Sequence, residues 1–283
     1  MLKIALIHDD KNQLAEGELL LLSYLNAQKD FSAKAASWQD DEIRWKNFDV
    51  VIIRAVYNYH EALQGFAEWL VIVEALGVEI FNSKDVLIWS AHKSYLLDLQ
   101  EEGVKIVDTL VVRQGQKYAH DPARFKSRQV IVKPAEGSSG HKVKKFINSE
   151  TSDIEEYIRD LLGQADVLVQ SFMEEIKDGE ANLVFFDKKF SHAAVRKPSA
   201  SDYRANLKYG GSEAVYLPSD LVVEQAQNIL RKIGADLLYA RVDGLVLGGE
   251  FILTELELIE PYLFFEMSKD SCANFTKALR SLV

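Results

Sequence analysis

The chain is poor in cysteine, in net positive charge and in long apolar runs. Its single cysteine, Cys272, excludes an internal disulfide and a cysteine-rich metal site. A net charge of -10 over 283 residues argues against a general nucleic-acid binder, which would carry a basic face. No apolar run is long enough to span a membrane, and the residues after Met1 resemble a strand rather than a signal peptide. We therefore expect a cytoplasmic protein with neither a nucleic-acid nor a membrane partner.

Two common nucleotide-binding motifs are also absent. No G-x-G-x-x-G follows the first predicted strand, which argues against a dinucleotide site there, and no G-K-[ST] completes a P-loop. The hydrophobic content of 48% and the charged content of 27% are typical of a globular protein with a sizeable core. There is no internal repeat and no low-complexity segment. Any nucleotide site must therefore be built from other residues.

The first eighty residues alternate between strand and helix patterns. Buried strands are predicted at Lys3–His8, Phe48–Arg54 and Val78–Phe81, with helices at Leu14–Leu25 and Glu61–Leu76. This alternation predicts a small parallel α/β domain. Arg54, Asn58 and Tyr59 follow its second strand, where open α/β sheets usually bind ligands, and they are candidate substrate residues. The alternative is that Arg54 only caps the strand or pairs with an acid.

Further elements follow along the chain. Helical spacing covers Ser83–Gly103, with Lys93 on its polar side, and further helices are predicted at Ser152–Leu162, Leu221–Ile233 and Leu263–Leu282. Strand patterns cover Val104–Val112, Gln129–Lys133, Lys142–Phe146, Val167–Phe172, Asn182–Phe186 and Phe190–Arg196. The polar loop Ser199–Gly211 is too long for a simple connector, which suggests a functional role.

A strand that ends at Lys133 leads into the glycine- and serine-rich turn Gly137-Ser138-Ser139-Gly140 and then into another strand pattern. Glycines let backbone amides approach phosphates, and the lysine supplies a positive charge. The segment is therefore predicted to be a phosphate-binding flap, with an ordinary hairpin turn as the alternative.

A run of acidic residues near the carboxyl end follows strand periodicity. Glu255 and Glu257 share one face of the strand Phe251–Leu258, and Asp243 joins them if the run Ala240–Asp243 forms a hairpin with that strand. Like charges placed this close repel each other, but they suit Mg²⁺, a hard cation that prefers oxygen ligands. The alternative is an amphipathic hairpin whose acidic face is solvated.

Four segments in this order resemble the ATP-grasp enzymes, in particular the glutathione-synthetase-like carboxylate–amine ligases. The segments are KPAEGSSG (133–140), VQSFMEEIKDGE (169–180), RANLKYGG (204–211) and TELELIEP (254–261). AVYNYH (55–60) and WSAHKSYLLDL (89–99) resemble a subgroup linked to cycloserine biosynthesis. The likeness runs from about residue 89 to residue 265 and is only architectural over the first eighty residues.

The resemblance implies a role for each matching residue. Lys93 and Lys133 would contact the phosphates of ATP, the flap Gly137–Gly140 would close over them, and Glu180 would bind the ribose. Backbone between Gln170 and Met173, including Phe172, would bind adenine. Arg196, Arg204 and Asn206 would serve the transferred phosphoryl group, and Asp243, Glu255 and Glu257 would hold Mg²⁺, as two ions, with Mn²⁺ as an alternative. Glu257 stands where the family usually has asparagine, which adds a negative charge to the site.

The expected fold is of the α/β class, an ATP-grasp α+β chain in three parts. A small parallel α/β domain (1–88) would precede a subdomain with the flap (89–168) and a subdomain with the metal site (169–283), with ATP between the last two. The expected activity is ATP- and Mg²⁺-dependent ligation of a small-molecule carboxylate to an amine through an acyl-phosphate, and a homo-oligomer is compatible with the sequence. The alternatives are another phosphoryl-transfer reaction on this fold and a nucleotide-binding sensor or scaffold without chemistry.

Overall fold

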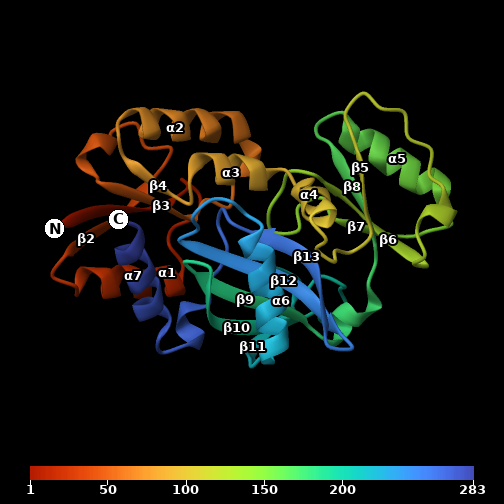
Figure 1. Cartoon of the computed structure of the whole chain (residues 1–283). Helices are drawn as coiled ribbons and strands as arrows, with labels where there is room; N and C mark the ends of the chain where they lie inside the picture. Colours follow the sequence, from red (N-terminus) through yellow and green to blue (C-terminus); the bar gives the residue numbers. More distant parts are fainter.

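The computed structural model describes residues 1–283 and contains three sheets. The first sheet has the order β2-β1-β3-β4 and is parallel (Figure 1). Its strands are β1 (Leu2–His8), β2 (Phe31–Ser37), β3 (Val50–Ala55) and β4 (Glu79–Phe81). Helix α2 (Leu63–Ala75) packs on one face through Phe66, Trp69, Leu70 and Val73. This sheet confirms the parallel α/β domain, although β2 was not predicted because small and polar residues make up most of it.

The second sheet is antiparallel, with the order β5-β8-β6-β7. Its strands are β5 (Thr109–Val112), β6 (Gln129–Pro134), β7 (Lys144–Ile147) and β8 (Val167–Ser171). Helix α5 (Thr151–Leu162) covers one face, because Ile154, Ile158 and Leu161 recur at helical spacing and pack on the sheet core. The other face is left for the segments that line the cavity described below.

The third sheet is also antiparallel, with the order β11-β10-β9-β12-β13. It contains β9 (Glu180–Phe186), β10 (Lys189–Lys197), β11 (Ser212–Tyr216), β12 (Tyr239–Leu247) and β13 (Glu250–Glu257). Helix α6 (Asp220–Arg231) packs on one face, and its amino end is capped by the Ser219 side chain, which accepts from the Val222 amide. The hairpin β12–β13 was predicted, whereas the exposed edge strand β11 was not.

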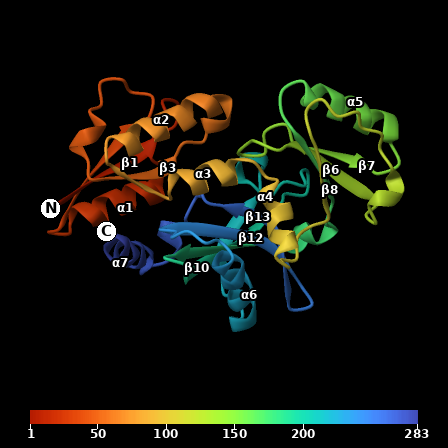
Figure 2. The ribbon, with the colours of Figure 1, turned by 45° about the horizontal axis from the view of Figure 1, so that its top comes forward.

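The carboxyl-terminal helix packs against both the first domain and the third sheet. Helix α7 (Ser271–Leu282) lies beside α1 (Glu16–Asn26), and one hydrophobic core contains residues of both helices, of β1 and of β9 (Figures 1 and 2). Phe264 has a φ of 49° in the left-handed region, so the helix cannot begin at Leu263 as predicted. The chain ends are thus brought together on one side of the molecule.

The helix predicted over Ser83–Gly103 is two helices, α3 (Lys84–Ala91) and α4 (Tyr95–Glu101). The break occurs where His92 turns to extended backbone and the amide of Lys93 donates to the carbonyl of Ala135 at 2.8 Å. Helix α3 packs with the first domain, and α4 packs with the third sheet. The break therefore links the first domain to the rest of the chain.

The predicted boundary after residue 168 would cut strand β8, which lies between β5 and β6 in the second sheet. We propose to place this boundary after Ser171. The predicted division after residue 88 falls within α3, so we propose to place it at His92, between α3 and α4. No helix of the chain has both the length and the apolar character required to cross a bilayer.

Candidate active site

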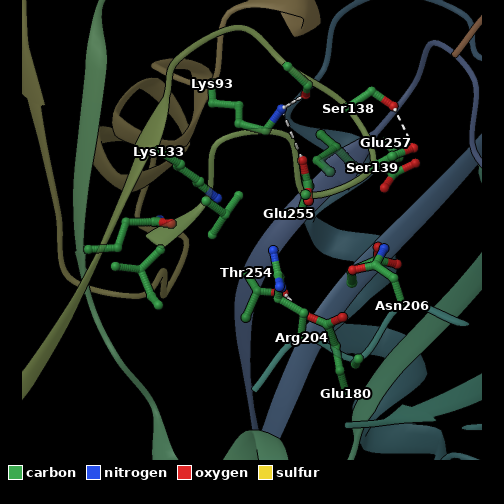
Figure 3. Close-up of a pocket in the computed structure, with 18 of the residues that line it drawn as sticks. Lys93, Lys133, Ser138, Ser139, Glu180, Arg204, Asn206, Thr254, Glu255 and Glu257 are labelled. Atoms are coloured by element: carbon green, nitrogen blue, oxygen red, sulfur yellow. Dashed lines mark hydrogen bonds and ion pairs between the residues drawn. The ribbon is translucent and has the colours of Figure 1, made fainter. Parts of the chain in front are cut away.

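One cavity is lined by all three parts of the chain. Its walls are the inner faces of the second and third sheets, the break between α3 and α4, and the loop that follows β13 (Figure 3). Tyr59 is the contribution of the first domain. Nearly every predicted site residue lines this cavity: Tyr59, Lys93, Lys133, Gly137, Ser138, Ser139, Gly140, Gln170, Phe172, Met173, Glu180, Arg196, Arg204, Asn206, Asp243, Glu255 and Glu257. Residues distant in the sequence therefore converge on one place.

Two lysines enter the cavity from different segments. Lys93 lies at the helix break, and its side chain is mostly buried, contrary to the expected place on a polar helix face. Its Nζ donates to the carbonyl of Gly137 at 2.5 Å and lies 3.2 Å from Glu255 Oε1. Lys133 comes from β6, and burial lowers the pKa of its ammonium group. The two cations point into the same space as the flap, where an anion would be held (Figure 3).

The flap and the polar loop are joined by tyrosines. The Tyr209 hydroxyl donates to the carbonyls of Ser139 and Gly140 at 3.4 and 3.3 Å, and the Tyr203 hydroxyl donates to Val143 at 3.0 Å. Gly140 has a φ of 69°, and a Cβ there would lie 3.0 Å from the Tyr209 ring, so glycine suits this contact. The polar loop therefore covers the outer side of the flap.

The guanidinium of Arg204 is fixed within this loop. It donates to Asp202 through Nε and Nη2 at 3.0 and 2.7 Å, and it stacks on the Tyr209 ring at 3.4 Å. Arg196 donates to Glu213 at 2.7 Å and lies 4.9 Å from the centre of the Phe264 ring. Both predicted arginines line the cavity, and each is oriented by its ion pair with an acidic side chain.

The acidic row lies on the cavity face of the third sheet. Asp243 stands opposite Glu255 in the β12–β13 register, and Arg241 stands opposite Glu257. Arg241, which sequence reasoning missed, donates to both oxygens of Asp243 at 2.8 to 3.1 Å and to Glu257 at 2.5 Å. The period-2 pattern contained the signal for it, because Arg241 precedes Asp243 by two residues and shares its face.

The acidic row fits a divalent cation in its chemistry but is not assembled as a metal cage. Burial raises the pKa of Glu257 to about 8 and that of Glu180 to about 7, and the neighbouring Asp243 adds to both shifts. A bound cation would relieve this surplus of negative charge. No group of three acidic, histidine or cysteine side chains is arranged to hold a metal ion, because Arg241 and Lys93 pair with the carboxylates. That Asp243, Glu255 and Glu257 hold Mg²⁺ stays a prediction, and in this structure each of the three carboxylates pairs with a lysine or an arginine.

Two residues predicted to bind substrate lie outside the cavity lining. Arg54 is fully buried, and its Nη2 donates to Glu18 at 3.1 Å and to the carbonyl of Pro261 at 2.6 Å. Asn58 donates through its amide to Asp9 at 3.0 Å and through its side chain to Asp10 at 3.0 Å. The structure thus supports the alternative for Arg54, an ion pair with an acid. Tyr59 is the one member of the set that reaches the cavity.

Comparisons with known proteins give the same picture. A family model described as the ATP-grasp domain of prokaryotic glutathione synthetase matches residues 99–270. The chain belongs to this ATP-grasp family. A second model, the N-terminal domain of D-cycloserine synthetase DcsG, matches residues 4–82, so the likeness of the first domain extends beyond its architecture.

Individual relatives of this ATP-grasp chain cover most of its length. The cycloserine biosynthesis protein DcsG of Streptomyces lavendulae is 28% identical over 266 residues, which are 88% of each chain. A glutathione synthetase of Ralstonia nicotianae (strain ATCC BAA-1114 / GMI1000) is 26% identical over 233 residues, 80% of this chain and 68% of that protein. These relatives confirm the resemblance and identify the chain as an ATP-dependent ligase that forms C–N bonds.

Solved structures with the same fold support the architecture. D-cycloserine synthetase DcsG superposes with a TM-score of 0.87 at 23% identity over 99% of each chain. D-alanine–D-alanine ligase from Bacillus anthracis, solved with ATP, gives a TM-score of 0.71 at 16% identity over 99% of this chain and 97% of that one. The predicted ATP-grasp α+β fold is thereby confirmed.

Proposed function

We propose that the protein joins a small-molecule carboxylate to an amine in an ATP- and Mg²⁺-dependent reaction that passes through an acyl-phosphate. The main support for this proposal is that two lysines, a glycine–serine flap, Arg241 and a row of carboxylates line one cavity. Phosphoryl transfer depends mainly on positioning and charge neutralisation, and these groups provide both. The products would be an amide, ADP and phosphate.

The nucleotide would lie between the second and third sheets. Lys93 and Lys133 would contact its phosphates, because both ammonium groups face the cavity and Lys133 makes no ion pair with a protein acid. Backbone at Gln170–Met173 would bind adenine. The side chain of Gln170 is already held by Thr109 at 2.8 Å, which leaves the backbone as the recognising group. Glu180, which accepts from Thr254 at 2.6 Å, would turn toward the ribose.

Asp243, Glu255 and Glu257 are the residues that would hold Mg²⁺, with Mn²⁺ as an alternative. The ion would supply charge neutralisation at the β- and γ-phosphates. A carboxylate has more lone pairs than these contacts use, so Asp243 could hold the ion while it accepts from Arg241, and Glu255 could do so while it pairs with Lys93. The ion pairs with Arg241 and Lys93 would keep these carboxylates oriented toward the cavity.

In the first chemical step, a carboxylate oxygen of the substrate attacks the γ-phosphorus of ATP, and ADP leaves. In the second step, the amine nitrogen attacks the acyl carbon, phosphate leaves with the C–O bonding electrons, and the nitrogen loses a proton. Arg196, Arg204 and Arg241 line the cavity and would offset the negative charge that develops on the transferred group. Asn206, beside them, would donate a neutral hydrogen bond.

The flap would protect the acyl-phosphate from water. Its backbone is held by Tyr209 of the polar loop and by the Nζ of Lys93, which donates to the Gly137 carbonyl, and Tyr203 holds Val143 just after the flap. Closure of this kind commits the intermediate to attack by the amine. The relatives are named for cycloserine biosynthesis and for glutathione synthesis, so we infer an amino-acid-like substrate pair. We also infer a cytoplasmic location, where ATP is available.

A screen for ADP release tests this proposal. The protein is incubated with Mg²⁺-ATP and pairs of amino acids, hydroxy acids and amines, and ADP is measured by a coupled assay. At least one pair should stimulate ADP formation together with a new amide detected by mass spectrometry. If the protein binds ATP but no pair stimulates ADP release, a nucleotide-binding scaffold is favoured. The ion pairs of the cavity carboxylates are compatible with that alternative as well.

A further inference from the structure

Glu260 is a cavity carboxylate without an ion-pair partner. It follows β13, lines the cavity and is only 8% exposed. The other cavity acids have partners: Glu255 pairs with Lys93, Asp243 and Glu257 pair with Arg241, and Glu180 accepts from Thr254. Glu260 makes no ion pair with any lysine, arginine or histidine of the chain. A buried carboxylate without a cation is costly and requires either a proton or a ligand.

The backbone around Glu260 is fixed from outside its own loop. Three buried side chains donate to three carbonyls that flank it: Asn82 to Leu258 at 2.9 Å, Tyr239 to Ile259 at 2.9 Å and Arg54 to Pro261 at 2.6 Å. The Arg54 side chain is in turn paired with Glu18, and both are fully buried. The backbone that carries Glu260 is therefore fixed in the cavity wall, which limits the positions that its carboxylate can take.

Tyr59 provides a second unsatisfied polar group in the same cavity. The residue is 3% exposed, lines the cavity and comes from the first domain, and its hydroxyl makes no hydrogen bond within the protein. Burial raises the pKa of Tyr59 well above its usual value, and Glu260 is the charged group that adds most to this shift. The Ser138 hydroxyl of the flap also lies near Glu260 and partly offsets the effect of burial on the pKa of that carboxyl. The flap, the first domain and the β13 loop thus meet around Glu260.

We propose that Glu260, together with the Tyr59 hydroxyl, binds the ammonium group of an amino-acid substrate. This ammonium group would serve to recognise the substrate and would not be the nitrogen that forms the amide. The proposal rests on the ligase function proposed above and names part of its substrate. An ammonium group has three donors and one positive charge, so it satisfies both an unpaired carboxylate and a free hydroxyl oxygen. A carboxylate also keeps the ammonium group protonated, which prevents that nitrogen from acting as the nucleophile.

Calorimetric binding with matched ligands tests the proposal. The wild type and the Glu260→Gln variant are titrated, with Mg²⁺ and a non-hydrolysable ATP analogue present, against amino acids and the same acids without the amino group. Alanine with propanoate and serine with 3-hydroxypropanoate are two such pairs. Glu260→Gln keeps the size of the side chain and removes only its charge. Glu266→Gln is the matched control, because Glu266 lies on the same loop, is exposed and does not line the cavity.

The wild type should prefer at least one amino acid over its deaminated partner by about tenfold or more, as expected for a charge pair in a desolvated site. Glu260→Gln should reduce that preference to less than about threefold, and Tyr59→Phe should reduce it in part, whereas Glu266→Gln should retain it. A preference unchanged by Glu260→Gln, or no preference in the wild type, would overturn the proposal. ADP release by the wild type is measured separately, and its absence would overturn the ligase function instead.

Discussion

The buried pair of Arg54 and Glu18 should contribute strongly to the stability of the chain. Both side chains are fully buried, their charged atoms lie 3.1 Å apart, and Arg54 also stacks 4.8 Å from the Tyr239 ring. Arg54→Met leaves Glu18 with no cation and the carbonyl of Pro261 with no side-chain donor. Breaking one half of such a pair costs about 3–5 kcal/mol. The melting temperature should therefore fall by roughly 6–15 °C.

Differential scanning calorimetry of three variants separates the ion pair from simple loss of packing. The double variant Glu18→Leu/Arg54→Met replaces both charges with apolar groups and should recover most of the stability lost in Arg54→Met. Lys11→Met is the control, because Lys11 and Glu61 form an exposed pair whose removal should leave the melting temperature nearly unchanged. An Arg54→Met protein that melts like the wild type, or a double variant no more stable than the single one, would refute the reasoning.

Four further predictions concern the cavity. Lys133→Ala should weaken ATP binding by about tenfold or more in calorimetry, since it removes a buried cation, and undiminished affinity would contradict its role. Glu255→Gln should nearly abolish turnover while Glu257→Asn keeps appreciable activity, because asparagine is the usual family residue there; equal loss in both would be evidence against this assignment. Tyr209→Phe keeps the ring under Arg204 but removes the hydroxyl bonds to the flap, so ADP release without amide formation should rise relative to the wild type. An unchanged ratio of ADP to amide would show that these bonds do not help the flap to exclude water. Burial raises the pKa of Glu260 from 4.5 to about 7, so the folded state holds this proton more tightly than the unfolded chain does. The contribution of Glu260 to stability should therefore be fully present below about pH 4.5 and should be lost as the pH rises through about 7, so between these two pH values the wild type should lose up to about 3 kcal/mol more stability than Glu260→Gln in denaturant titrations.

Much of the fold and many of the cavity residues could be predicted, because local patterns in the sequence mark the strands and loops that carry them. Buried strands such as β1 and β3 are continuous apolar runs, and the β12–β13 hairpin is marked by alternation around Gly248 and Gly249. Strand β2 carries only weak strand formers, and its place beside β1 comes from tertiary packing. The break at Lys93 also escaped prediction, because the partner that stabilises it is the carbonyl of Ala135, far away in the sequence.

The structure places Arg54 differently from its prediction, and it adds Arg241 and Glu260, which had no predicted role. Arg54 ends a strand where ligands usually bind, but Glu18 of α1 lies opposite and neutralises it, a contact between segments that no periodicity reveals. Arg241 lies within the predicted hairpin, on the same face as Asp243, and the alternation could have identified it. Glu260 directly precedes Pro261 at the end of a recognised motif. Its importance emerges only once the other acids are seen to have partners.

Isotope transfer tests the central claim most directly. A carboxylate substrate that stimulates ADP release is labelled with ¹⁸O in both carboxyl oxygens, and the phosphate formed with Mg²⁺-ATP and the amine is analysed by mass spectrometry. Formation of an acyl-phosphate moves one carboxyl oxygen to the γ-phosphorus, so each phosphate released with amide should carry one ¹⁸O atom. Phosphate without ¹⁸O, formed alongside the amide, would contradict the account.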